Sequence, residues 1–189
     1  MTIHLRAIEP EDLDALYELE NDSELWAQGI TNVPYSRYQL HDYVANATAD
    51  IYVDGQVRLV IESADKQFIG LADITSFDAT HRRAEAGLMI KKSFRHQGIG
   101  HKVMMLLADY ALRILHLHQL YAVIDINNEA CIQLFRDLGY RESSRLTDWL
   151  FDGTDYHDAV VMQRCLLRNS EQTTAVATAT FKLSAECDE

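Results

Sequence analysis

Apolar and polar positions alternate along the chain in runs that predict an ordered series of strands and helices. Residues 4–8 alternate as a short strand, and a single apolar stripe at helical spacing follows from about residue 10 to residue 20. Pro10 and the carboxylates around it suit the first turn of that helix. Residues 37–47 predict a second helix. The first quarter of the chain is therefore expected to be one strand and two helices.

The middle of the chain changes to the shorter period of strands and then back to that of helices. Two strands joined by the polar turn at 63–67 are expected to form a meander with a third. The remaining expected elements, in order, are strands at 57–62, 68–75 and 83–90, a turn at 94–100, a helix at 101–115, a strand at 120–126, a helix at 129–138 and strand from residue 140 onward. This order predicts an α+β domain built around a mixed, mostly antiparallel central sheet flanked by helices.

Length and composition favour one compact domain. The chain has 189 residues, of which 48% are hydrophobic, enough to bury a single sizeable core. We expect that domain to occupy residues 1–168 and residues 169–189, which are rich in Thr and Ala, to form a flexible tail. An added edge strand at 178–183 is the structured alternative.

Charge and cysteine usage exclude several classes of protein. A formal net charge of −12 argues against a nucleic-acid surface and suits a cationic small molecule as a partner. The N-terminus lacks the features of a secretory signal, so we expect a cytoplasmic protein. The most apolar region, residues 103–126, contains charged side chains and histidines that argue against a membrane span. Neither the three cysteines nor the histidines have metal-ligand spacing, so no metal is predicted.

A glycine-bearing turn between a strand and a helix carries the strongest chemical signal. Gly98 and Gly100 let the main chain approach an anion, and the start of the following helix presents N–H groups without partners. Arg95, Lys102 and His101 add positive charge there. The pattern matches neither a Rossmann loop nor a P-loop. It predicts a phosphate-binding turn, with a turn that binds nothing as the alternative.

The spacing Arg95-x-x-Gly98-x-Gly100 resembles the acyl-CoA signature of the GNAT superfamily of N-acetyltransferases, over about residues 5–166. Within that superfamily the chain is most similar to spermidine and diamine N-acetyltransferases. The similarity rests on residues 81–85, 115–121, Asn128 with the glutamate after it, and 138–140.

The resemblance implies a GNAT fold in which two strands splay apart and hold acetyl-CoA between them. The backbone of Leu88, Met89 and Ile90 would then bind the pantetheine arm as an added strand does. Gly87 would suit the bulge that starts the splay. The pyrophosphate would lie on Arg95, His96, Gln97, Gly98, Ile99, Gly100, His101 and Lys102. Asn128 would cap the next helix and contact the cofactor, and Phe135 would line the site.

The resemblance also assigns catalytic roles. Glu85 is the expected general base, because a primary amine with a pKa of ~10.4 must lose a proton before it can attack. An ion pair of Glu85 with Arg82 or Arg83 is the structural alternative. The N–H of Leu88 or Met89 would bind the thioester oxygen as its negative charge develops.

Two positions depart from the pattern of the family. Many relatives have a tyrosine that protonates the departing thiolate, whereas the matching residue here is Phe135. Water, Tyr140 or Tyr121 would then supply the proton. The loop at residues 29–38 contains none of the acidic residues typical of polyamine enzymes and includes Arg37.

The sequence leaves three hypotheses for function. The first is acetyl transfer from acetyl-CoA to a primary amine, expected to be cationic and of the spermidine or diamine type. The second is N-terminal acetylation of a protein such as a ribosomal protein, with an aminoglycoside-like amine also possible. The third is an acyl-CoA-binding module with little or no turnover. Because relatives are often dimers or larger, a homo-oligomer is also possible.

Overall fold

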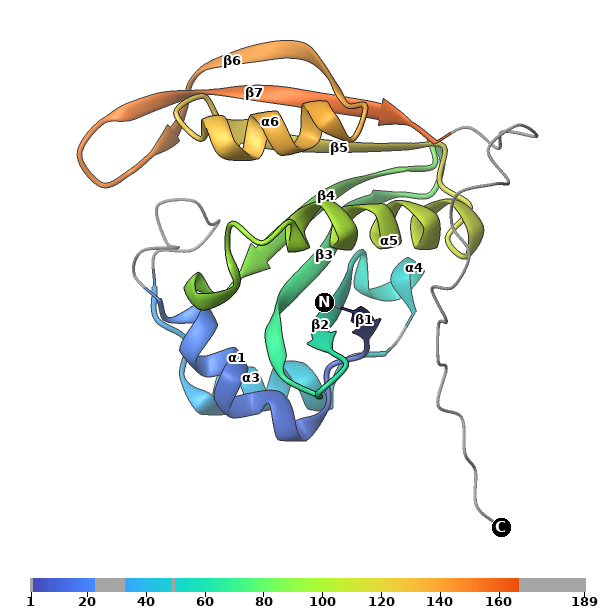
Figure 1. The fold of residues 1–189 in the computed structure, drawn as a ribbon, viewed down its shortest axis with the longest axis vertical. Helices are drawn as coiled ribbons and strands as arrows, with labels where there is room; N and C mark the ends of the chain where they lie inside the picture. The colour runs from blue at the N-terminus through green and yellow to red at the C-terminus, as the bar shows by residue number, and fades with distance from the viewer. Residues whose placement is uncertain (1, 23–32, 49, 167–189) are drawn as a thin grey trace.

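The computed structural model describes residues 2–22, 33–48 and 50–166, whose strands form one seven-stranded sheet in the order β1-β2-β3-β4-β5-β7-β6 (Figure 1). Neighbouring strands are antiparallel except β4 and β5, which are parallel. The predicted mixed, mostly antiparallel sheet is therefore confirmed. The predicted tail at 169–189 lies outside the described residues. The strands are β1 (Ile3–Arg6), β2 (Val57–Ser63), β3 (Phe68–Asp78), β4 (Arg83–Ile90), β5 (Gln119–Asp125), β6 (Arg141–Phe151) and β7 (Tyr156–Cys165).

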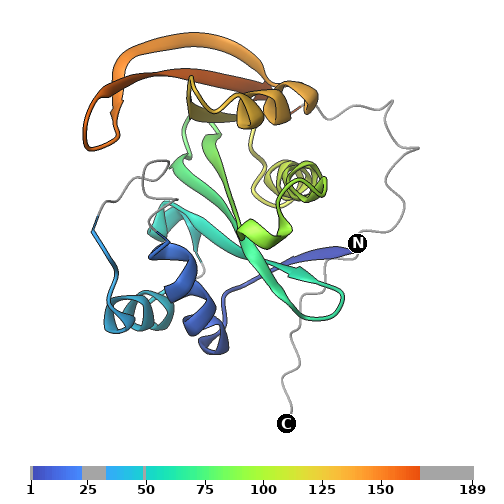
Figure 2. The same ribbon diagram turned by 60° about the vertical axis from the view of Figure 1, so that its left-hand side comes forward.

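Helices cover the two faces of the sheet, as Figures 1 and 2 show. Apolar side chains of α5 and α6 share the larger core with β4 and β5, while α1 and α3 close a smaller core on the opposite face. These two layers place different helices above and below the β4 strand. The helices are α1 (Leu13–Glu20), α3 (Arg37–Ala45), α4 (Ile51–Asp54), α5 (Ile99–Arg113) and α6 (Glu129–Asp137), with single 3-10 turns η1 (Pro10–Asp12) and η2 (Lys92–Phe94).

Side chains on β4 alternate between these two faces. Ala84 and Ala86 belong to the larger core, and Leu88 and Ile90 pack against it. Met89 packs against the smaller core of α1 and α3. Because successive strand residues point to opposite faces, Glu85 and Gly87 lie on the α1/α3 face with Met89.

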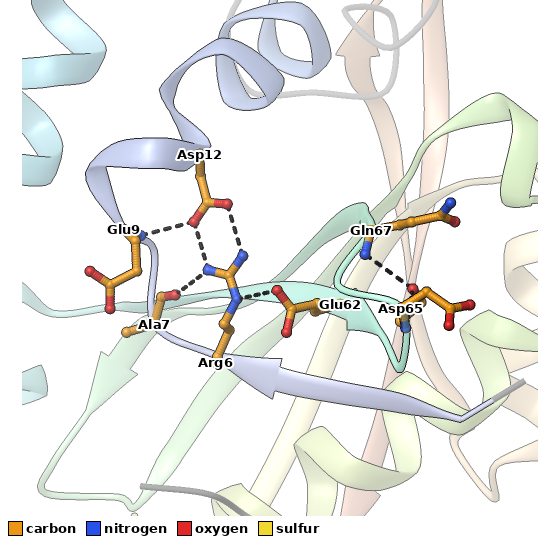
Figure 3. Close-up of polar contacts among 8 residues, drawn as sticks. Arg6, Ala7, Glu9, Asp12, Glu62, Asp65 and Gln67 are labelled. Atoms are coloured by element: carbon orange, nitrogen blue, oxygen red, sulfur yellow. Dashed lines mark hydrogen bonds and ion pairs between the residues drawn. The ribbon is translucent and has the colours of Figure 1, made fainter. Parts of the chain in front are cut away.

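A buried ion pair joins β1 to the start of α1 (Figure 3). The guanidinium of Arg6 donates two hydrogen bonds to Asp12, at 2.6 and 2.9 Å, and a third to Glu62 on β2, at 2.8 Å. Burial by itself raises the pKa of Asp12, but the hydrogen bonds from Arg6 and from the N–H of Glu9 outweigh it and lower the pKa. The carboxylate of Asp12 thus stays ionised, and its bonds to Arg6 hold the start of α1 against β1.

Several elements differ from the sequence prediction. The helix expected from residue 101 begins at Ile99, because Gly98 adopts φ +71° and serves as its N-cap residue. The strand expected to end at residue 75 continues to Asp78. The short helix α4 was not predicted; Asp50 caps it by accepting from the N–H of Tyr52, and Gly55 ends it.

Candidate active site

The strands β4 and β5 separate immediately after Glu85. Their parallel ladder pairs Arg83 with Gln119, Ala84 with Leu120 and Glu85 with Tyr121, and ends there. Beyond this point β4 continues to Ile90 beside β3, while β5 continues to Asp125 beside β7. The predicted splayed strand pair is confirmed, and we call the opening between the two strands the β4–β5 gap.

Backbone groups of alternate residues face this gap. The N–H of Lys91 donates to the Ile69 carbonyl on β3 at 2.9 Å. In an antiparallel ladder the residues that bond to one neighbour alternate along the strand, so the amide of Met89 also faces β3. The amides of Leu88 and Ile90 therefore face the gap. The carbonyl of Ile90 accepts from Nε of Arg95 at 2.9 Å.

The carboxylate of Glu85 lies at the closed end of the gap. It accepts a hydrogen bond from the backbone N–H of Val123 on β5 and one from the Ser76 hydroxyl at 3.4 Å. Burial raises the pKa of Glu85, and these hydrogen bonds only partly oppose that effect. Arg83, the partner considered in the alternative role, pairs with Asp78 at 3.2 Å. Glu85 is thus placed as a half-buried acid with a raised pKa, as a general base requires.

The bulge expected at Gly87 is not found there. The ladder between β3 and β4 runs without interruption from Gly70 opposite Ile90 to Thr75 opposite Glu85, and it includes Gly87 opposite Asp73. The irregularity lies beyond Thr75, where Ser76 adopts φ +50°. The gap therefore opens without a bulge in β4 between Glu85 and Ile90.

The two glycines of the turn before α5 have different roles. At Gly98, where φ is +71°, a built Cβ meets no atom within 4 Å, so the backbone is open to an approaching group. A Cβ at Gly100 would lie 3.2 Å from Leu88 and 3.2 Å from Leu134, so this glycine lets α5 pack closely against β4 and α6. The first-turn amides of α5 have no acceptor within the helix. The backbone at Gly98 is thus accessible next to the N-terminus of α5.

The cationic side chains at this turn are Arg95 and Lys102, and most side chains of the turn are accessible. Arg95 is half-buried, and His96, Gln97, His101 and Lys102 are exposed. His96 adopts φ +60°. The side-chain amide of Gln97 donates a hydrogen bond to the Ser93 carbonyl at 3.0 Å, and this bond helps to hold the shape of the turn. Ile99 is buried as the first apolar contact of α5. The positive end of the helix dipole and these cations favour a negatively charged group.

Helix α6 follows β5, with Asn128 as its N-cap residue and Phe135 near its end. Asn128 accepts from the N–H of Cys131 at 3.1 Å, which confirms its predicted N-cap role. Phe135 is 2% exposed and meets Tyr140 edge to face, with ring centroids 4.8 Å apart. The Tyr140 hydroxyl has no hydrogen-bond partner among the described residues, and burial raises the pKa of Tyr140 to about 12.

An ion-pair network on the α1/α3 face was missed by the sequence analysis. Arg58 on β2 makes two hydrogen bonds to Asp73 on β3, at 2.9 and 3.1 Å, and also pairs with Glu20 of α1. Burial lowers the pKa of Arg58, but the two carboxylates outweigh it and raise it. In each of the two strands a charged residue between apolar neighbours was the available signal, although only the strand register shows that the two residues face each other.

The described residues also form a groove outside the β4–β5 gap. This groove of about 680 Å³ lies between α6 and β6 and is lined in part by Glu129, Gln133, Glu142 and Arg145. Among the described residues no three His, Cys, Asp or Glu side chains are grouped to hold a metal ion. No helix in these segments has the length and apolar character needed to cross a membrane.

Comparisons with known proteins agree with this geometry. The chain is 28% identical over 162 residues to the spermidine N(1)-acetyltransferase of Escherichia coli (strain K12), covering 85% of this chain and 84% of that protein. It resembles the crystal structure of spermidine N-acetyltransferase from Vibrio cholerae in complex with CoA and spermine, with a TM-score of 0.78, 26% identity, and coverage of 87% and 95% of the two chains. A dodecameric structure of the Vibrio cholerae enzyme gives a TM-score of 0.74 and 27% identity, covering 87% and 94%. Residues 2–141 match the acetyltransferase (GNAT) domain, and the chain belongs to this family of acetyltransferases.

Proposed function

We propose that this protein transfers the acetyl group of acetyl-CoA to a primary amine of a spermidine-type polyamine. The observation that carries the proposal is the separation of β4 and β5 directly after Glu85, with the open glycine turn at the far end of the same strand. Relatives of similar length are named as spermidine N-acetyltransferases, which supports the choice of acceptor.

The gap suits the pantetheine arm of acetyl-CoA. That arm carries amide groups, and the edge of β4 offers the N–H of Ile90 to it, much as a strand offers its edge to a peptide. The diphosphate would lie on the first-turn amides of α5 beyond Gly98, beside Arg95, His101 and Lys102. Asn128 caps α6 and lies just after the end of β5, which borders the gap. In this proposal it also contacts the cofactor.

Glu85 removes a proton from the acceptor ammonium, directly or through a water, so that the neutral nitrogen can attack the thioester carbon. The N–C bond forms, the nitrogen gives up its second proton to water, the C–S bond breaks, and the sulfur leaves with the electron pair. The N–H of Leu88 faces the gap and stabilises the negative charge that develops on the carbonyl oxygen. Because Met89 directs its amide toward β3, Leu88 is the oxyanion donor in this proposal.

We infer that the thiolate leaves without a proton from Tyr140. Burial raises the pKa of Tyr140 to about 12. Transfer of its proton to a thiolate with a pKa of ~8.5 is uphill by ~3.5 pKa units, or ~5 kcal/mol. A thiolate is an adequate leaving group at neutral pH, and water can protonate it afterward. Phe135 is therefore compatible with turnover.

Charge on the α1/α3 face also suits a cationic acceptor. Arg37, which the sequence marked as unfavourable for a polyamine, is paired with Asp14 and lies over the ring of Tyr17, with 4.5 Å between the guanidinium carbon and the ring centre. Its charge is thus already compensated within α1 and α3. The net charge of −12 adds long-range attraction for a polycation.

An acceptor panel tests the proposal. Purified protein would be incubated with acetyl-CoA and spermidine, putrescine or a peptide with a free N-terminus, and products followed by mass spectrometry. We expect a mass increase of one acetyl group on spermidine with stoichiometric release of CoA. Acetylation of the peptide alone would favour N-terminal acetylation. Binding of acetyl-CoA without transfer to any acceptor would favour an acyl-CoA-binding module.

We also propose that the protein self-associates. The described part of the β6–β7 hairpin exposes large aromatic side chains, Trp149 at 59%, Phe151 at 57% and Tyr156 at 65%. Exposed aromatic groups clustered on one element are typical of contact surfaces. A Vibrio cholerae relative is described as dodecameric.

A further inference from the structure

A row of side chains crosses three strands on the α1/α3 face and stops at a glycine. Arg58 on β2 is opposite Asp73 on β3, and Asp73 is opposite Gly87 on β4. Residues directly opposite each other in a sheet point to the same face. The row therefore runs from a paired arginine and aspartate to an empty position next to the gap.

Neither backbone conformation nor packing explains a glycine at this position. Gly87 is not among the residues with positive φ. A Cβ built on it meets, among the described residues, only the Cβ of Asp73 at 3.5 Å, which is an ordinary contact. Glycine inside a strand costs roughly 0.5–1 kcal/mol relative to alanine. A strand glycine without such causes commonly marks a place where a ligand approaches closely.

Gly87 lies next to the residues that carry the proposed reaction. It lies two residues after Glu85 on the same face of β4, and it directly precedes Leu88, whose N–H faces the gap. β5 no longer pairs with β4 at this level. An acceptor that reaches Glu85 from the α1/α3 face must therefore pass over Gly87, beside Asp73.

Asp73 gives this passage a negative wall. Its side chain is 13% exposed and is held by two hydrogen bonds from Arg58. Arg58 also pairs with Glu20, whose side chain is 9% exposed, so this group of two carboxylates and one guanidinium carries one net negative charge. Ionised Glu85 adds a second.

We propose that Gly87 determines acceptor specificity: its missing side chain forms the passage by which an unbranched primary ammonium group reaches Glu85, with Asp73 facing that group. This inference rests on the proposed function and deepens it. A passage one side chain wide admits an amine on a straight methylene chain, as in a linear polyamine. The α-amine of a peptide N-terminus is attached to a branched carbon and is excluded.

The test compares Gly87→Ala and Gly87→Val with wild type, and uses Ala64→Val as a control that adds bulk on the exposed β2–β3 turn. Spermidine binding to the protein–CoA complex is measured by calorimetry, KM for spermidine by initial rates, and acetyl-CoA affinity separately. Gly87→Val is expected to weaken spermidine binding and raise its KM by roughly tenfold or more, while acetyl-CoA affinity stays within about twofold. Gly87→Ala is expected to give a smaller shift in the same direction, and Ala64→Val none.

The outcomes separate this inference from the proposed function. If Gly87→Val folds and leaves both spermidine values within about twofold of wild type, the passage is refuted. Should the valine variant fail to fold, the same criterion applies to Gly87→Ala, whose added methyl group has room. If wild type binds spermidine without acetylating it, the proposed function fails, and the calorimetric comparison still decides the role of Gly87. A wild-type protein that acetylates peptide N-termini and does not bind spermidine overturns the inference.

Discussion

Replacing Glu85 with glutamine removes the proposed base while it keeps the shape of the side chain. The amide oxygen of glutamine can still accept from the N–H of Val123 and from the Ser76 hydroxyl, so the closed end of the gap should persist. General base catalysis typically contributes about 10²–10⁴ in rate, or ~2.7–5.4 kcal/mol of barrier. We expect Glu85→Gln to lower kcat by that range while acetyl-CoA affinity stays unchanged.

The pH dependence follows from the direction of the pKa shift. Glu85 acts as a base only when ionised, and burial raises its pKa above the ordinary 4.5. The wild-type rate should therefore rise with pH through a limb that lies above pH 4.5. The glutamine variant should lose this limb and keep only the rise caused by deprotonation of the amine itself, which has a pKa of ~10.4.

The pH dependence of stability provides a second test of the raised pKa of Glu85. Stability should change with pH in the opposite direction from activity. Because the folded-state pKa of Glu85 is raised, the native state binds more protons than the unfolded state between the two pKa values. The contribution of Glu85 to stability is then greatest at low pH and is lost as pH rises through its folded pKa. At pH 7 the glutamine variant should therefore unfold at a higher temperature than wild type, and this difference should shrink as pH falls toward 4.5.

The assay is initial-rate kinetics with acetyl-CoA and spermidine from pH 5 to 9.5, together with thermal unfolding over the same range and Glu142→Gln as a control. Glu142 is an exposed carboxylate on β6, outside the gap, so the control makes the same chemical change without touching the site. A Glu85→Gln enzyme whose kcat stays within about threefold of wild type and whose pH profile is unchanged would refute the assignment of the base.

Three further predictions concern the turn, the buried phenol and assembly. Gly98→Asp should weaken acetyl-CoA binding at least about tenfold by setting a carboxylate against the diphosphate. Gly55→Asp is its matched control because Gly55 has φ +66° and equally open surroundings. Equal affinities of the Gly98→Asp variant and wild type for acetyl-CoA, measured by calorimetry, would contradict the phosphate role. Tyr140→Phe removes a buried hydroxyl that has no hydrogen-bond partner among the described residues. It should raise the free energy of unfolding in urea by up to about 1–3 kcal/mol and leave kcat within about threefold of wild type. A larger fall in kcat would show that this phenol takes part in catalysis. Light scattering after size exclusion should give a mass above the 21.6 kDa of one chain, and a mass equal to it would exclude self-association.

The sequence predicted the elements that carry strong periodicity. The bounds of β4 and the start of α6 matched, because apolar alternation and an asparagine cap are both local signals. The short helix α4 has too few residues for a periodic stripe, although Asp50 before it and Gly55 after it were signals that could have revealed it. The start of α5 shifted by two residues because the left-handed conformation of Gly98 is set by the turn.

Features that depend on strand register could not be read from the sequence. The pairing of Arg58 with Asp73 exists only because the two residues are opposite each other on β2 and β3. The sequence offered the neighbouring arginines as alternative partners of Glu85, whereas the structure supplies Ser76 and the backbone of Val123 from other strands. Which amides of residues 88–90 face the gap follows from the ladder with β3, and it narrows the oxyanion donor to Leu88.

A crystal structure with bound CoA would show whether the cofactor lies in the β4–β5 gap with its diphosphate at the turn before α5. We expect the diphosphate on the first-turn amides of α5 next to Gly98, and the pantetheine arm along β4 with a hydrogen bond from the N–H of Ile90. Its sulfur should lie near the point where β4 and β5 part, within reach of a nitrogen that Glu85 could deprotonate. CoA bound elsewhere, for instance in the groove between α6 and β6, or a β4–β5 gap closed around side chains, would contradict this expectation.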